Sequence, residues 1–381
     1  MRSWSEQALF EFLYRTREPD YCSHTNPSIS VSTEALYNTF ATHRLLSWMY
    51  RSQRCILFYT CENYTLWCHN KTLSLITVLA GGTGSIKLIR GLASQTRDLT
   101  IISNVGDNIW LYGLYICPDI DTVIYGLADI LDEQQGWGIK TDSFGFLEQV
   151  CMLGEQTWFK LGDRDLATHV IRTNMLKAGK NLSEITEWMR VRYGISSKII
   201  PATNSPIETK ILTDKGEMNI QQFWVKHRGE PKVRRVFYKG SRKARINPEI
   251  IRTIKESEMI VVAPANPITS IAPILSIKVL KKNLIEERKK IVAISPLIGD
   301  KAVSGPAVKY MKAMKLQISP IGIAEYYSDF VGKFIISPTD YNISSRIQNL
   351  GLKVYLTNIL MKNRNDEIRL ASYLMGHLRS A

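Results

Sequence analysis

Four residues that could bind phosphate stand between an apolar run and a helix-length segment: Gly81, Gly82, Thr83 and Gly84. Backbone N–H groups at the start of a helix bind phosphate, and glycine allows a ligand to approach the chain closely. The stretch matches neither G-x-x-x-x-G-K-S/T nor G-x-G-x-x-G, so it supports neither a P-loop ATPase nor a dinucleotide enzyme. The alternative interpretation is a tight turn between strand and helix without a ligand.

Three aspartates come next in the chain: Asp107, Asp119 and Asp121. Carboxylates near a phosphate ligand commonly hold Mg²⁺, which keeps several waters and bridges to phosphate oxygens. A carboxylate in this place can instead orient or deprotonate an attacking hydroxyl group. The structural alternative is that Asp119 or Asp121 caps the start of a helix.

A second polar cluster contains Asp163, Arg164 and Asp165, followed by His169. Arg164 is either a fork that binds phosphate or the partner of a neighbouring aspartate. His169 lies four residues after Asp165, which places the two on one face of a helix. We interpret this histidine as structural.

The elements that position these residues begin near residue 72, where short apolar runs alternate with helix-length segments. Runs typical of buried strands are 75–80, 99–103, 259–263, 291–295 and 334–337, with 352–356 as a weaker candidate. Helical patterns lie between them, for example at 85–94 and 121–132. This alternation predicts an α/β fold with a Rossmann-like, doubly wound and mostly parallel sheet.

The middle of the chain has a different pattern, which predicts an inserted, smaller α+β region at 156–254. It contains two helical segments, a hairpin signal around Asp214-Lys215-Gly216 and a basic strand candidate at 232–238. The Rossmann-like core then consists of 73–155 and 255–381.

Stretches rich in Gly, Asn, Pro and Asp follow four of the predicted strands, at 81–84, 104–108, 264–270 and 296–300. In an open parallel sheet the carboxyl ends of the strands share one edge, where ligands bind in a crevice. A merely structural connection needs no such set of specialised loops. We therefore expect an enzyme site at this edge.

Composition excludes several other classes of protein. The 381 residues are 45% hydrophobic and 22% charged, which argues against a disordered, collagen-like or coiled-coil chain. Apolar runs stay well below the ~18 residues that span a bilayer, so we expect a cytoplasmic protein without a membrane partner. The formal charge of +14 suits an anionic substrate. The basic clusters at 234–235 and 242–245 match no nucleic-acid-binding motif, so no nucleic acid partner is expected.

The first seventy residues differ from the rest, because they contain neither glycine nor lysine. We expect 1–72 to be an N-terminal extension, either disordered or not native to the protein, that carries none of the chemistry. Cys55, Cys61, Cys68 and His69 do not match the paired spacing of a structural zinc site, so unpaired thiols are the favoured interpretation.

Five blocks of sequence together resemble the 2-phospho-L-lactate transferase family, CofD. They read ITVLAGGTG at 76–84, CPDIDTV at 117–123, LGDRDLATH at 161–169, NPITSI at 266–271 and SPLIG at 295–299. The similarity runs in order from about residue 75 to about residue 340 and leaves out the first seventy residues.

The resemblance implies a transferase that moves a phospholactyl or phosphoenolpyruvyl group from a guanosine-diphospho donor to the 5′-hydroxyl of the deazaflavin Fo. GMP leaves, Mg²⁺ is the cofactor, and the product is a precursor of coenzyme F-420. Members of the family pair as homodimers, so a homodimer is expected. Transfer of this type needs positioning and charge neutralisation more than covalent chemistry, which agrees with the residues above.

The resemblance also implies roles for individual residues. Asp107 and Asp121 are the expected catalytic and metal-binding carboxylates, and Asp121 and Lys160 are the expected Fo contacts. The donor guanylate and its phosphates are expected to lie against Gly81, Gly82, Thr83, Gly84, Asn266, Thr269, Ser270, Pro296 and Gly299. Asn108 departs from the family, because many relatives carry a second acid there. The alternative within the superfamily is a regulator that binds a nucleotide sugar without turnover.

Overall fold

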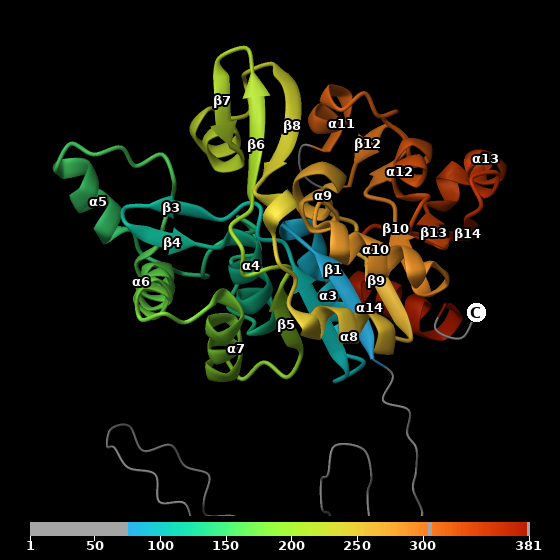
Figure 1. Ribbon diagram of the computed structural model, residues 1–381, viewed down its shortest axis with the longest axis horizontal. Coiled ribbons are helices and arrows are strands. Elements are labelled where there is room, and N and C mark those ends of the chain that lie inside the picture. Colours follow the sequence, from blue (N-terminus) through green and yellow to red (C-terminus); the bar gives the residue numbers. More distant parts are fainter. Residues whose placement is uncertain (1–74, 304–306, 379–381) are drawn as a thin grey trace, which may run out of the picture. The chain divides into compact units, whose positions relative to one another are not determined.

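A seven-stranded parallel sheet forms the centre of the protein (Figure 1). The computed structural model describes residues 75–303 and 307–378. The strand order is β14 (Lys353–Leu356), β13 (Lys333–Ile336), β10 (Ile291–Ile294), β9 (Met259–Val262), β1 (Ile76–Ala80), β2 (Leu99–Ser103) and β5 (Lys198–Pro201). All neighbouring strands in this sheet pair in parallel. The inner strands are buried along their whole length, which explains their continuous apolar sequences.

Helices cover both faces of this sheet. On one face α3 (Thr83–Ala93) packs against α4 (Pro118–Leu127) and α14 (Arg364–His377), and on the other α8 (Pro248–Glu256) packs against α10 (Lys278–Glu286). The other α-helices are α5 (Gly145–Met152), α6 (Asp163–Lys177), α7 (Leu182–Arg192), α9 (Ala272–Leu275), α11 (Ala307–Ala313), α12 (Pro320–Tyr327) and α13 (Ser344–Gln348). Short π- and 3₁₀-helical turns are η1 (Gln222–Lys226), η2 (Ser241–Lys243), η3 (Pro267–Ile271), η4 (Arg288–Lys290) and η5 (Pro338–Ile343).

The strand order changes direction between β1 and β9. The chain passes from β1 through β2 to β5 on one side, and from β9 through β10 and β13 to β14 on the other. Ala80 at the end of β1 pairs with Ser103 of β2, and Leu79 pairs with Val262 of β9. The loops that follow these three strands therefore begin at the same edge, at the switch point where open α/β sheets bind ligands.

Three small antiparallel sheets stand outside the central one. They are the hairpin β3 (Ile109–Leu111) and β4 (Leu114–Ile116), the three-stranded sheet of β6 (Glu208–Thr213), β7 (Gly216–Asn219) and β8 (Val233–Lys239), and the pair β11 (Leu297–Ile298) and β12 (Lys301–Ala302). The three-stranded sheet lies at the carboxyl ends of the central strands (Figure 1). Thr209 N donates to Gly106 O (2.7 Å), and Tyr238 Oη donates to Ile268 O (2.7 Å). These bonds hold the small sheet against the switch-point loops.

The α/β fold and all six strands predicted for the central sheet are confirmed. The hairpin signal and the basic strand of the middle region correspond to β6, β7 and β8. The range 156–254, however, also contains β5, which is an edge strand of the central sheet. The small antiparallel sheet is therefore only part of that range, and the described residues fall into one compact unit.

The predicted extension at 1–72 and the cysteines at 55, 61 and 68 lie outside the described residues. Within the described part of the chain, none of the helices is both long enough and apolar enough to cross a membrane.

Candidate active site

The glycine loop after β1 is in direct contact with the loops after β2 and β9. A side-chain carbon on Gly81 would lie 2.8 Å from Ser270 Cβ and 3.0 Å from Asn104 Cβ, so only glycine fits there. Gly82 precedes α3 with a φ of 66°, in the left-handed region that favours glycine. Its missing side chain leaves the start of α3 open to a ligand, and no side chain caps this helix.

The side-chain amide of Asn104 links the loop after β2 to the loop after β9 and to Asp119 at the start of α4. Its Nδ2 donates to Asp119 Oδ2 (2.8 Å) and to Thr269 O (3.2 Å). Its Oδ1 accepts from Gly106 N (2.8 Å). Asn104 is completely buried, and no sequence motif marks it as a site residue. Its only sequence signal is its position directly after a buried strand.

Asp119 is the carboxylate that faces the glycine loop. Its side chain accepts a hydrogen bond from the backbone N–H of Gly82, and the residue is 5% exposed. Burial raises its pKa to about 6, against the lowering effect of the hydrogen bonds from Asn104 and Gly82. The interpretation of Asp119 as a helix cap is wrong, because α4 begins at Pro118 and the capping position is Cys117.

Asp107 carries a second carboxyl group at this edge, and the residue as a whole is half-buried. Its Oδ1 is buried and has no hydrogen-bond partner among the described residues. Burial, and then the negative charge of Asp119, raise the pKa of Asp107 well above its ordinary value. Two neighbouring carboxyl groups with raised pKa values suit a site that receives a cation or a proton.

The residues at this edge fit Mg²⁺ in the way that nucleotide-dependent enzymes commonly hold it. The described residues contain no group of three or more His, Cys, Asp or Glu side chains that could hold a metal ion. Mg²⁺ needs no such cage, because one or two carboxylates suffice when waters and substrate phosphates supply the other ligands. The unpartnered Oδ1 of Asp107 is a carboxylate oxygen that could serve as such a metal ligand.

Asp121 is placed differently from the other two aspartates. Arg172 Nη1 donates to its Oδ2 (3.0 Å), and Arg172 Nη2 donates to its Oδ1. Both oxygens are therefore occupied by a buried guanidinium group, and Asp119, not Asp121, is the carboxylate beside the glycine loop. The predicted roles of Asp121 in metal binding, in catalysis and in Fo contact stay predictions.

Lys160 is exposed and lies beside a separate cavity of about 270 Å³ near α5. The other residues that line this cavity are Phe144, Leu147, Glu148, Cys151 and Thr157. Its walls are partly apolar and aromatic, which suits a flat ring.

The loop after β9 carries a buried N–H donor that has no partner among the described residues. Asn266 Oδ1 accepts from Ile268 N (3.0 Å) and Thr269 N (3.3 Å), which caps η3. Its Nδ2 is buried and has no partner within the described part of the chain. An unpartnered buried amide group is costly, so this N–H group is available to a ligand. Thr269 and Ser270 are buried beside it.

The loop at Pro296 and Gly299 follows β10 and forms the β11–β12 turn. Gly299 N donates to both carboxylate oxygens of Asp340, at 3.0 and 3.2 Å. Asp340, which no sequence pattern marked, therefore occupies the backbone N–H of a glycine that was predicted to lie against the donor guanylate.

Asn108 donates to Tyr115 Oη (3.1 Å), and its Oδ1 is buried without a partner among the described residues.

Among the described residues, the side chains of Arg164 and Asp163 bond to the segment 140–146. Arg164 Nη1 donates to Lys140 O (3.3 Å), and Asp163 accepts from Ser143 Oγ and from two backbone N–H groups. These bonds account for the polar cluster without a ligand.

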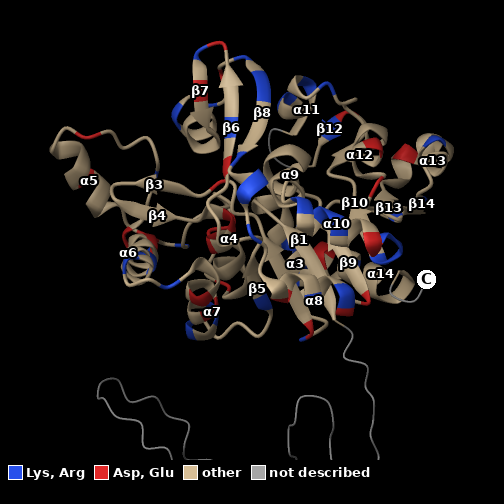
Figure 2. Ribbon diagram, viewed as in Figure 1, with Lys and Arg blue, Asp and Glu red and all other residues tan. Residues whose placement is uncertain are grey.

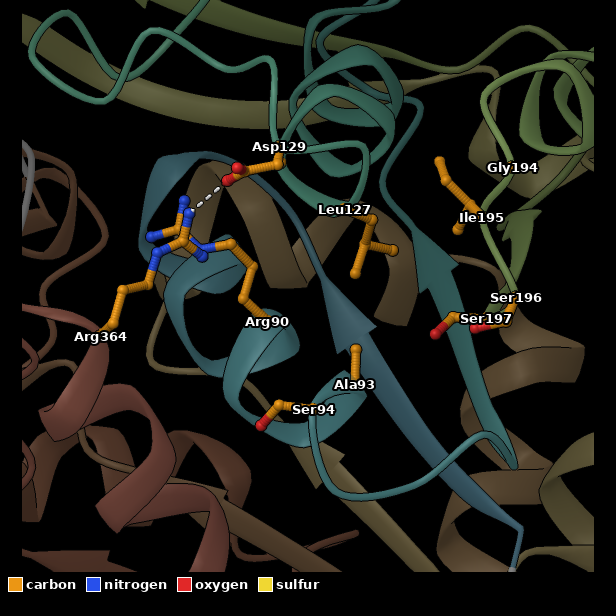
Figure 3. Close-up of a pocket in the computed structure, with 11 residues that line it drawn as sticks. Arg90, Ala93, Ser94, Leu127, Asp129, Gly194, Ile195, Ser196, Ser197 and Arg364 are labelled. Atoms are coloured by element: carbon orange, nitrogen blue, oxygen red, sulfur yellow. Dashed lines mark hydrogen bonds and ion pairs between the residues drawn. The ribbon is translucent and has the colours of Figure 1, made fainter.

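The edge where the strands begin holds a cavity of about 290 Å³ between the ends of α3 and α4 and the start of β5 (Figure 3). Arg364 in its wall donates to Asp129 Oδ1 (2.8 Å) and Glu133 Oε1 (2.7 Å). Arg90 donates to Glu367 Oε2 through Nε (3.0 Å). Both guanidinium groups are paired with acids, so neither is left over for an anionic ligand.

A doubly wound parallel sheet with buried carboxyl groups and a glycine loop at its switch point defines an α/β protein of the Rossmann-like, ligand-binding class. The profile of the family described as 2-phospho-L-lactate transferase CofD matches residues 76–361. The chain belongs to this family, which is a family of enzymes.

Relatives with this activity in their names align with most of the chain. The 2-phospho-L-lactate transferase of Methanocaldococcus jannaschii is 40% identical over 307 residues, which cover 79% of this chain and 97% of the relative. The one from Methanosarcina mazei is 38% identical over 300 residues, 78% of this chain and 98% of the relative. A crystal structure of a UPF0052 family member from Bacillus halodurans has a TM-score of 0.51 and 16% identity. It covers 79% of this chain and 99% of its own, and supports the fold alone.

Proposed function

We propose that this enzyme transfers a phospholactyl or phosphoenolpyruvyl group from a guanosine-diphospho donor to the 5′-hydroxyl of the deazaflavin Fo, releasing GMP in coenzyme F-420 biosynthesis. One observation carries the proposal. The glycine loop, two carboxyl groups with raised pKa values and two unpartnered buried polar atoms converge at the switch point of the sheet. Membership of the transferase family supports turnover over the alternative of a non-catalytic regulator.

The donor is proposed to lie along the loops after β1 and β9. Backbone N–H groups at the start of α3 and the free Nδ2 of Asn266 donate to its phosphate oxygens. Lys and Arg residues on the neighbouring strand β8 add positive charge to this side of the protein (Figure 2). These groups bind the negative charge of a diphosphate without covalent chemistry.

Asp107 would hold Mg²⁺, which neutralises charge on the transferred phosphate when it is bound. Asp119 takes the proton of the attacking hydroxyl group, and a pKa near 6 suits a base that works close to neutral pH. The hydroxyl oxygen forms a bond to the phosphorus that carries the three-carbon acid. The bond from that phosphorus to the GMP phosphate oxygen breaks, and GMP leaves with the electron pair.

Lys160 and its cavity are proposed to contact the ring of Fo, because the partly apolar walls match a flat, weakly polar ligand. A homodimer is proposed on the resemblance to the family.

The test supplies the protein with Mg²⁺, Fo and each guanylated donor in turn, and measures GMP release together with the mass of the Fo product. We expect GMP and product in equal amounts with one of the donors. Hydrolysis of a donor without an Fo product, or an absence of GMP with every donor, would contradict the proposal.

A further inference from the structure

Helix α6 buries polar side chains, which is unusual for a helix packed inside an α/β protein. Its buried residues are Asp165, Thr168, His169, Arg172 and Thr173. Apolar side chains of similar size would serve stability at least as well in such positions. The polar face therefore needs a reason beyond packing.

Arg172 is the centre of this face and is completely buried. It binds both oxygens of Asp121 on α4, and its Nη1 lies 3.1 Å from His169 Nδ1. Burial by itself lowers the pKa of Arg172, but the Asp121 carboxylate more than offsets this and raises it, so the guanidinium stays charged. Asp121 and Arg172 thus form a bidentate buried ion pair between two helices.

A second contact joins the same two helices one turn away. His169 Nε2 lies 3.2 Å from Asp165 Oδ1, and Tyr125 Oη donates to Asp165 Oδ1 (2.6 Å). Asp121 and Tyr125 are both on α4, four residues apart. The contacts therefore run from α4 through three side chains of α6 and back to α4. We call these five side chains the α4–α6 clamp.

The clamp acts on the turn of α4 that carries Asp119. Asp119 lies two residues before Asp121 and places its carboxylate against Gly82 N–H and Asn104 Nδ2. Rotation of α4 about its axis, or translation along it, would move that carboxylate relative to the glycine loop. The clamp opposes both motions, because it holds α4 at two positions one turn apart.

We propose that Arg172 is a positioning residue for the transfer reaction, which through Asp121 fixes the start of α4 and thereby the carboxylate of Asp119. This inference rests on the proposed function, in which Asp119 accepts the proton. A displacement of a reacting group by about 1 Å can lower turnover by up to ~10²-fold without loss of substrate binding. A merely structural arginine would affect stability alone.

The chain offers a matched control for this test. Arg90 is also buried and makes a bidentate pair, with Glu367, but it lies at the opposite edge of the sheet. Lysine retains the charge at either position and loses the planar fork, so Arg172→Lys and Arg90→Lys remove the same kind of contact. We expect both variants to melt at a lower temperature than the unaltered protein. Only Arg172→Lys should lower kcat, by ~10-fold or more, with the KM for the donor changed by less than about 2-fold.

Tyr125→Phe tests the other end of the clamp and covers the outcome in which Arg172→Lys does not fold. It removes one hydroxyl group, and we expect a fall in kcat of several-fold at nearly unchanged KM. Equal kcat in Arg172→Lys and Arg90→Lys after correction for the folded fraction would overturn the inference, as would an unchanged kcat in Tyr125→Phe. Absence of GMP release from the unaltered protein would instead contradict the proposed function, and this inference with it.

Discussion

The two edges of the central sheet differ in how their buried polar groups are satisfied. Where the strands end, Asp107 and Asn266 keep buried polar atoms without a partner among the described residues. Where the strands begin, Arg90 and Arg364 line a cavity of about 290 Å³, and acidic side chains pair with both. A group left unpaired costs free energy unless a ligand completes it, whereas a satisfied ion pair needs none. Buried polar atoms without a hydrogen-bond partner therefore indicate the site better than cavity volume does.

Neutralising the acidic partner of a buried arginine should change the free energy of unfolding more at one edge than at the other. Asp121→Asn leaves the Arg172 guanidinium without its charged partner, and removal of one member of a buried pair costs about 3–5 kcal/mol. Glu367→Gln should cost less, because Glu133 still pairs with Arg90. Chemical denaturation of both variants measures the difference. Equal, small losses would mean that neither pair is held as tightly as its geometry indicates.

Neutralising one carboxylate should lower turnover at the edge where the strands end and leave it unchanged at the edge where they begin. We expect Asp119→Asn to lower turnover by ~10²-fold or more, because the amide cannot accept the proton. Asp129→Asn, at the opposite edge, should retain the turnover of the unaltered protein. GMP release measured on both variants decides this. Similar turnover in the two variants would remove Asp119 from the reaction.

The pH dependence of stability should also come from carboxyl groups at the edge where the strands end. The pKa of Asp119 is raised from 3.8 to about 6, so the folded protein binds a proton that the unfolded chain has released. Its contribution to the free energy of unfolding should therefore fall as the pH rises from about 4 through 6, by roughly 1–3 kcal/mol. Melting temperatures recorded without Mg²⁺ should show this slope. The raised pKa of Asp107 adds a slope of the same sign, so Asp119→Asn should make the slope smaller without abolishing it. The same slope in Asp119→Asn would assign the proton to another group.

The smallest effect compares two glycines with nearly the same φ angle. Gly82 and Gly194 have φ angles of 66° and 67°, in the region that favours glycine, so alanine is strained at either position. An added carbon at Gly82 would lie 3.2 Å from Ser270 Oγ in the loop after β9, and at Gly194 it would meet nothing within 4 Å. We expect Gly82→Ala to raise the KM for the donor by ~10-fold and Gly194→Ala to leave it unchanged. Steady-state kinetics on both variants would show whether the glycine loop contacts the donor.

Most of the central sheet was predictable, because strands buried on both faces must be apolar throughout. Strand β5 was missed because its four residues, Lys198–Pro201, include a lysine and a proline and form the outermost strand of the sheet. The hairpin of β3 and β4 was missed because each of its strands has only three residues, too few for a clear alternation.

The site could be predicted only where a local pattern reports it. The glycine loop stands out because glycines cluster after a strand, and the aspartates because carboxylates are rare in buried segments. Arg172 could not be found in this way, since its partner Asp121 is 51 positions away and only the packing of α6 on α4 brings them together. For the same reason, the sequence could not tell which of Asp119 and Asp121 faces the crevice.

Amide hydrogen exchange on the whole protein, with and without GMP and Mg²⁺, tests directly whether the site lies at the carboxyl ends of the strands. GMP is the leaving group of the proposed reaction and should bind where the donor is proposed to lie, along the loops after β1 and β9. We expect slower exchange at residues 81–85 and 266–271, and no change at 194–198 beside the cavity of the opposite edge. Protection at 194–198 with none at the glycine loop would contradict the assignment of the site to the carboxyl ends of the strands.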